Sequence, residues 1–213
     1  MSTNAPSLLF YLLATLSVFV TPVSAKSDSV AKVIANKGKV EIQRQDKILK
    51  AKRRDELKTQ DVVKTGNKAR AQFKFNDGTI TTLGADSEMV VKEFDWQDGE
   101  KSPSAEFTLV KGVFRTVTGL ITKVDDPKYK VHTPLGSIGI RGTDFWGGYL
   151  DENAIDVLFV AGEHAIEVSN EFGTVMLEKP GQGTTIKPGT APSKPKAWPA
   201  AKVERAVKTI TLD

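Results

Sequence analysis

The sequence predicts an all-β protein, and two observations indicate this fold class. Between residues 29 and 177 the apolar residues fall in short alternating runs, which is the period of half-buried strands and not of helices. Gly, Asn and Asp separate these runs, as tight turns require. We expect a multi-stranded sandwich or jelly-roll-like domain with a short C-terminal helix. A short β-solenoid is the alternative, because strand spacing alone does not choose between them.

The N-terminal segment predicts export. Residues 8–20 are mostly apolar, and the small residues of the segment 21–25 follow them. The apolar core of about 13 residues is shorter than the roughly 20 that cross a bilayer as a helix. We therefore expect residues 1–25 to be a signal peptide, cleaved between Ala25 and Lys26. The mature chain is expected to be periplasmic or secreted, without a stable transmembrane anchor.

The composition excludes several function classes. The chain contains no Cys, which rules out disulfides, a lipid-anchored cysteine and a thiol nucleophile. Lys and Arg total 30 against 26 Asp and Glu, and the resulting charge of +4 is too small to indicate a nucleic-acid partner.

The clearest local element is a hairpin over residues 71–83. Residues 71–75 alternate, residues 76–78 supply a turn that tolerates positive φ, and residues 79–83 return as the second arm. Two more hairpins are expected further along the chain. The first joins residues 156–160 to residues 165–168, and the second places residues 174–177 after the turn at 170–173. One β domain over residues 29–186 accommodates all of these strands.

The C-terminal region changes in composition. Residues 187–199 combine Pro, Gly, Ser and Lys, which predicts a solvated linker. The apolar residues that follow share one helical face: Val203, Ala206, Val207 and Ile210. We expect a short helix over residues 200–213, which either caps the β domain or docks a partner.

The inventory of catalytic side chains is small. His132 and His164 are the two imidazoles of the chain, and neither has a neighbour at the spacing typical of a zinc site. Ser137 lies between glycines, but Leu135 stands where a nucleophile elbow needs glycine. We therefore expect no enzymatic activity, no metal and no cofactor.

Three residues are candidates for a binding or a structural role. Gly139 and Gly142 flank Arg141 closely enough for its guanidinium to approach a carboxylate or a backbone carbonyl in a fixed fork. An internal pair that ties adjacent strands is the alternative role for Arg141. Trp146 and Tyr149 end the run Trp-Gly-Gly-Tyr, which would place two rings on opposite faces of one strand.

A distributed pattern of residues carries a resemblance to a known family. In order, these residues are Leu57, Asp61, Val62, Thr65, Gly66, Ala69, Ala71, Asp77, Gly78, Thr79, Leu83, Leu109, Gly112, Val131, Thr133, Pro134, Ile138, Gly139, Arg141, Gly142, Thr143 and Phe145. Over roughly residues 38–168 the chain thereby resembles the FecR-like periplasmic domain of surface-signalling proteins. In transducers of the ferric-citrate type, a similar domain receives a contact from an outer-membrane receptor. It relays the contact through a membrane helix to a cytoplasmic segment that controls a sigma factor.

The resemblance implies a non-enzymatic protein-binding or sensory module for envelope signalling, whose partner is an unidentified envelope protein. The alternative is a module that binds cell-wall glycan or another polysaccharide. A protein-binding module is expected to expose an unpaired edge strand or an apolar patch. A polysaccharide-binding module is instead expected to line a groove with Trp or Tyr rings, near Arg141 or the basic run at residues 47–54.

Overall fold

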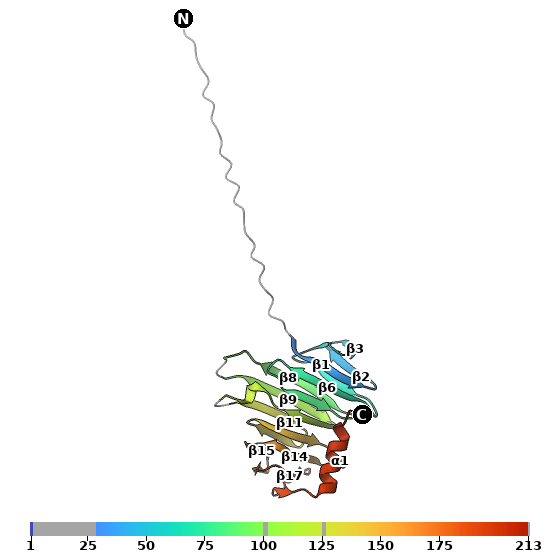
Figure 1. Ribbon diagram of the computed structural model, residues 1–213, viewed down its shortest axis with the longest axis vertical. Helices are drawn as coiled ribbons and strands as arrows, with labels where there is room; N and C mark the ends of the chain where they lie inside the picture. Colours follow the sequence, from blue (N-terminus) through green and yellow to red (C-terminus); the bar gives the residue numbers. More distant parts are fainter. Residues whose placement is uncertain (2–28, 100–101, 125–126, 213) are drawn as a thin grey trace.

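The computed structural model describes Met1 and residues 29–99, 102–124 and 127–212, and these form two large β-sheets with one C-terminal α-helix (Figure 1). The predicted signal peptide and its cleavage site at Ala25 lie outside the described residues. Within the described ranges, no helix is long and apolar enough to cross a membrane.

Each sheet has nine strands. In spatial order, sheet A contains β18 (Lys196–Ala197), β17 (Gln182–Ile186), β14 (Ile155–Gly162), β13 (Thr143–Gly148), β10 (Val113–Val117), β7 (Ile80–Leu83), β6 (Arg70–Phe75), β1 (Ser29–Lys37) and β4 (Glu56–Lys58). Sheet B contains β16 (Gly173–Leu177), β15 (Ile166–Asn170), β12 (Gly136–Ile140), β11 (Lys128–Thr133), β9 (Ser104–Lys111), β8 (Glu88–Asp95), β5 (Val62–Thr65), β2 (Val40–Arg44) and β3 (Lys47–Lys50). A single 3-10 turn, η1 (Leu120–Thr122), precedes β11 in the described part of the chain.

The chain advances steadily along the sandwich while it alternates between the sheets. The first strands lie at one end of the molecule and the last strands at the other, as the colour gradient in Figure 1 shows. Neighbouring strands are antiparallel except for β9 and β11, which are parallel. The predicted all-β sandwich is confirmed, and the sheets form neither a closed barrel nor a solenoid.

One hydrophobic core fills the space between the sheets. Strand residues alternate between this core and solvent, as β6 shows with Ala71, Phe73 and Phe75 buried. The ring of Phe107 in sheet B lies 5.3 Å from that of Phe75 in sheet A and 5.5 Å from that of Tyr129. Burial of each large apolar side chain contributes about 1.5–3 kcal/mol, so the paired inner faces hold the two sheets together.

Two of the three predicted hairpins are present. Strands β6 and β7 pair in the register Ala71↔Leu83, and β15 pairs with β16 across the turn between Asn170 and Gly173. The hairpin predicted between β14 and β15 is wrong, because β14 lies in sheet A and β15 in sheet B. The chain crosses from sheet A to sheet B at residues 163–165. Phe159 and Ile166 therefore enter the shared core from opposite sheets.

Helix α1 (Ala200–Ile210) covers the outer face of sheet A, along its lower right side in Figure 1. Its buried residues Ala206 and Ile210 pack in a cluster with Trp146 and Trp198, and the Trp146 Nε1–H donates a hydrogen bond to Thr209 Oγ1 at 3.0 Å. The predicted helix is therefore present, ends at Ile210, and packs on the β domain as a cap.

The segment predicted as a solvated linker, residues 187–199, is attached to sheet A. Ser193 N–H donates to the Thr185 carbonyl at 3.0 Å, and β18 pairs with β17. Trp198 is only 7% exposed. Pro and Lys are the commonest residues of this segment, but these contacts outweigh their preference for a free chain.

Candidate functional site

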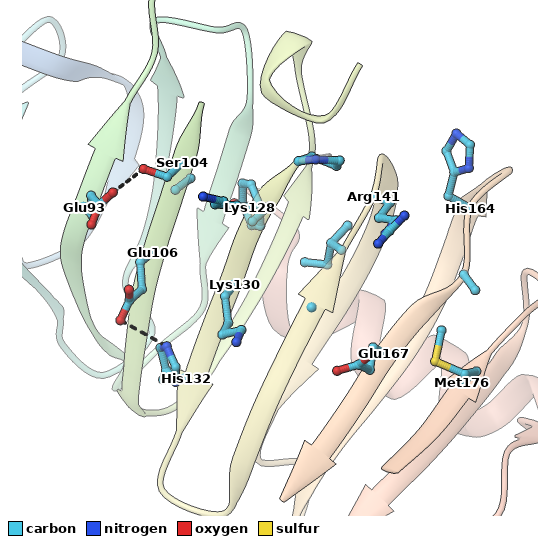
Figure 2. Close-up of a pocket in the computed structure, with 16 residues that line it drawn as sticks. Glu93, Ser104, Glu106, Lys128, Lys130, His132, Arg141, His164, Glu167 and Met176 are labelled. Carbon is cyan, nitrogen blue, oxygen red and sulfur yellow. Dashed lines mark hydrogen bonds and ion pairs between the residues drawn. The ribbon is translucent and has the colours of Figure 1, made fainter. Parts of the chain in front are cut away.

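A broad groove of about 900 Å³ crosses the outer face of sheet B (Figure 2). It extends from β8 through β9, β11, β12 and β15 to β16, at the half of the sandwich built by the later strands. The polar and charged residues that line it are Glu93, Ser104, Glu106, Lys128, Lys130, His132, Arg141, His164 and Glu167, with Met176 at its far side.

Strand alternation positions these side chains. In β11, Tyr129 and Val131 are buried in the core, so Lys128, Lys130 and His132 project from the opposite face into the groove. Neighbouring strands contribute their outward residues in the same way. The groove is therefore built on paired strands, which hold its side chains on a rigid scaffold.

Gly139 forms part of the groove floor. It lies in β12 between Lys130 of β11 and Glu167 of β15, which are its cross-strand partners. A Cβ atom built at Gly139 would meet one neighbour within 4 Å, the Glu167 Cβ at an ordinary contact distance of 3.7 Å. The absence of a side chain there deepens the groove.

Charges of opposite sign alternate across the groove. Glu106 on β9 is followed by Lys130 on β11, and beyond the glycine floor Glu167 follows on β15. Figure 2 shows Lys130 and Glu167 on opposite sides of the groove. Such a surface complements a partner that also carries both signs of charge.

His132 is held in a fixed orientation by two neighbours. Its Nε2 lies 3.0 Å from Glu106 Oε1, and its Nδ1 lies 3.1 Å from Ser137 Oγ. Serine, histidine and glutamate are the residue types of a nucleophile triad. Strand β12, which carries Ser137, is paired with β11 on one side and with β15 on the other, so the backbone groups of its paired residues are engaged in the sheet. The chain of contacts positions an imidazole at the groove wall.

The three sequence-predicted candidates lie in different places. Arg141 is exposed at the end of β12 and lines the groove. Arg141 and His164 also line a smaller hollow of about 210 Å³, together with Lys123. Trp146 is 1% exposed beneath α1, and Tyr149 is half-buried against the core, where burial raises the pKa of its phenol. The structure thus brings Arg141 to the groove, but neither Trp146 nor Tyr149.

The groove does not present a stacking platform for sugars in the described part of the chain. Tyr129 is the one aromatic residue among its lining residues, and its ring is 3% exposed. Trp146 and Trp198 pack edge to face with 6.3 Å between ring centroids, inside the cluster under α1. The basic strand β3 forms the opposite end of sheet B.

Sequence reasoning missed the central groove residues Lys130, Gly139 and Glu167. The alternation of residues 128–132 could have placed Lys128 and Lys130 on the solvent face of a strand. The sequence does not indicate which strands are neighbours in sheet B, where β9, β11, β12 and β15 lie side by side. Within the described residues, no group of three His, Asp or Glu side chains is arranged to hold a metal ion.

Comparison with known proteins identifies a domain and a shared fold. The family model described as "FecR protein" matches residues 61–163. Two crystal structures of a "putative anti-sigma factor" from Parabacteroides distasonis, at 1.65 and 2.50 Å resolution, are similar to the chain with a TM-score of 0.51 and 18% sequence identity. In both, the similarity covers 67% of this chain and 62% of the other, so the chain spans less than two thirds of that protein. No curated protein matches the chain.

Proposed function

Because this chain is FecR-like, with the family match over residues 61–163, we propose that it is an exported, non-enzymatic module of envelope signalling. The groove on sheet B is the surface by which it binds another envelope component. The observation that carries this function is the position of the groove: four of its six strands, β8, β9, β11 and β12, lie inside the family match. The similarity to a protein described as an anti-sigma factor supports a regulatory role.

A folded protein or peptide is the partner class that suits the groove best. Exposed ion pairs contribute only about 0.2–1 kcal/mol each, so the alternating charges select the partner more than they provide affinity. The floor at Gly139 admits a side chain or a strand from the partner, and Met176 adds an adaptable apolar contact. A glycan partner would lack the exposed rings on which it usually stacks.

Export is a separate part of the proposal and has its own test. The tagged full-length chain is expressed in its host, and the N-terminus of the recovered protein is sequenced. We expect a mature protein that begins at Lys26 and is recovered from the envelope. An unprocessed N-terminus would contradict cleavage and would favour an anchored transducer.

The binding proposal is tested by crosslinking in intact envelopes followed by affinity recovery of the tagged chain. We expect one dominant envelope protein with the unchanged chain, and at least a several-fold loss with Lys130→Glu, which reverses a charge inside the groove. The matched control is Lys74→Glu, an exposed charge reversal on sheet A, which should leave recovery unchanged.

Two results would overturn the proposal. Equal recovery with Lys130→Glu and with Lys74→Glu would remove the groove as the binding surface. Recovery of peptidoglycan or other glycan fragments in place of a protein would replace the protein-binding function with a polysaccharide-binding one.

A further inference from the structure

The four sheet edges of the sandwich differ in how well they resist pairing with another strand. Sheet A ends at β4, which has three residues, and at β18, which has two. Sheet B ends at β3 and at β16. Short length and Lys residues are common protections of an edge strand, and β3 carries Lys at both of its ends. Strand β16 has neither protection.

Strand β16 is a five-residue edge strand without a charge. Its sequence is Gly-Thr-Val-Met-Leu, and it pairs on one side with β15. Thr174 is exposed and Met176 is 41% exposed, while Val175 is half-buried at the margin of the core. A Cβ built at Gly173 would lie 3.2 Å from the Ala191 Cβ, and β16 is the terminal strand of sheet B among the described residues.

The register of β15 and β16 shows which backbone groups face the open edge. The pair Asn170↔Gly173 closes a two-residue turn, which requires a hydrogen-bonded pair there. The bonds of Gly173, Val175 and Leu177 therefore point to β15. The N–H and C=O groups of Thr174 and Met176 point away from the sheet, towards the open edge.

We propose that β16 is a self-association site at which a second copy of this chain adds its own β16 antiparallel, so that the two B sheets become one. A two-fold axis at Val175 places Thr174 of each copy opposite Met176 of the other. These residues supply the free N–H and C=O groups, so the axis generates a symmetric set of backbone hydrogen bonds. The two Val175 side chains meet and join the margins of the two cores.

Charge complementarity favours this occupant over an unrelated strand. Antiparallel pairing brings the turn before β16, which carries Glu171, near the turn after β16 of the second copy, where Lys179 follows Glu178, and this contact occurs twice by symmetry. The corresponding self-pairing of β3 would place Lys47 opposite Lys50 of the second copy, which is repulsive. Since the two-fold axis is perpendicular to the sheet, both grooves would open on the same face of the dimer.

The absence of Cys from the chain permits a direct test by disulfide formation. Opposed residues of a non-hydrogen-bonded antiparallel pair have Cα atoms about 4.5 Å apart, within the range of a disulfide. Val175→Cys in the purified full chain should therefore form covalent dimers several-fold faster than Ile48→Cys. Ile48 is the matched control, because it is 67% exposed on the other edge of sheet B.

Molar mass in solution provides the second measurement. The unchanged chain should approach twice its monomer mass as concentration rises, and the double change Thr174→Lys with Met176→Lys should return it to the monomer mass. Both substituted residues are solvent-exposed, so circular dichroism should show an unaltered fold. A monomeric unchanged chain, equal crosslinking at positions 175 and 48, or a dimer that survives the double change would each overturn the proposal.

Discussion

At the residue scale, the family pattern combines side chains that fill the core with residues that fix turns. Asp61 is fully buried and accepts hydrogen bonds from Arg44 Nε at 2.8 Å and from the Lys58 N–H at 2.8 Å. The hydrogen bond with Asp61 raises the pKa of the Arg44 guanidinium. Gly112 has φ +87°, and a Cβ there would lie 2.2 Å from Ser87 Oγ. Such residues identify a fold from the sequence because the backbone at those points needs them.

Asp77 gives a prediction about stability. Its carboxylate is 2% exposed and accepts hydrogen bonds from Thr79 N–H at 2.8 Å, Thr79 Oγ1 at 2.6 Å and Ile121 N–H at 3.2 Å. Asp77→Asn would replace one accepting oxygen by an NH₂ group, which would then face the N–H and O–H donors of Thr79 and Ile121. This change should lower the free energy of unfolding by about 2–3 kcal/mol. Urea unfolding measures this change. Asp46→Asn in an exposed turn is the control, and an equal effect of both changes would contradict the role given to Asp77.

Tyr129 gives a prediction about alkaline pH. Burial raises the pKa of its phenol well above the ordinary value of about 10, so the folded state keeps the proton after the unfolded state has lost it. The stabilisation is present below pH 10 or so and is lost as the pH rises further. Tyr129→Phe should flatten this decline in unfolding free energy. At neutral pH it should change stability by less than about 1 kcal/mol, because the buried hydroxyl makes no hydrogen bond of regular geometry, although the Thr116 and Thr81 hydroxyls lie near enough to interact with it weakly.

The half-buried Tyr149 is the matched control for the alkaline experiment. Burial also raises the pKa of its phenol, but the ring is more exposed than that of Tyr129. Tyr149→Phe should therefore retain most of the alkaline decline. If Tyr129→Phe declines as steeply as the unchanged chain, burial of Tyr129 is not what couples stability to pH.

At the scale of elements, alternation predicted the strands, but not every partner. The turn at residues 76–79 joins two strands of one sheet, whereas the turn at 163–165, one residue shorter, joins strands of different sheets. β6 buries alternate residues, whereas β14 buries all of residues 155–159, yet either kind of strand can begin a hairpin. The local pattern therefore does not separate the two turns. What decides between them is that Phe159 enters the core from sheet A and Ile166 enters it from sheet B, which no local signal contains.

The attachment of α1 gives a prediction at this scale. Lys202 Nζ lies 2.6 Å from Asp156 Oδ1, whose residue is 1% exposed, and 4.1 Å from the centre of the Trp198 ring. Lys202→Met would leave that carboxylate buried without its cation, and should cost about 2–4 kcal/mol. Thermal unfolding measures the loss. Lys208→Met on the exposed face of α1 should cost less than about 0.5 kcal/mol, and a comparable loss there would contradict the docking role of Lys202.

At the scale of the whole molecule, the groove exists because strands that are distant in sequence become neighbours. Glu93 and Met176 line the same groove, although β8 and β16 are far apart in the sequence. The sequence predicts which side chains leave the core, but the order of the strands decides which of them share a surface. Arg141 could be predicted because the glycines that flank it are adjacent in the sequence. Lys130 and Glu167 become groove residues only because strand pairing places them on either side of Gly139.

The most direct test of the binding role of the groove is Gly139→Val, measured for both stability and partner recovery from crosslinked envelopes. A Cβ there makes only an ordinary contact with the Glu167 Cβ at 3.7 Å, and valine suits a strand better than glycine, so stability should be equal or up to about 1 kcal/mol higher. Because the side chain fills the groove floor, recovery of the envelope partner should fall several-fold, whereas Lys74→Val on sheet A should not affect it. Full recovery with a stably folded Gly139→Val protein would show that the partner binds elsewhere.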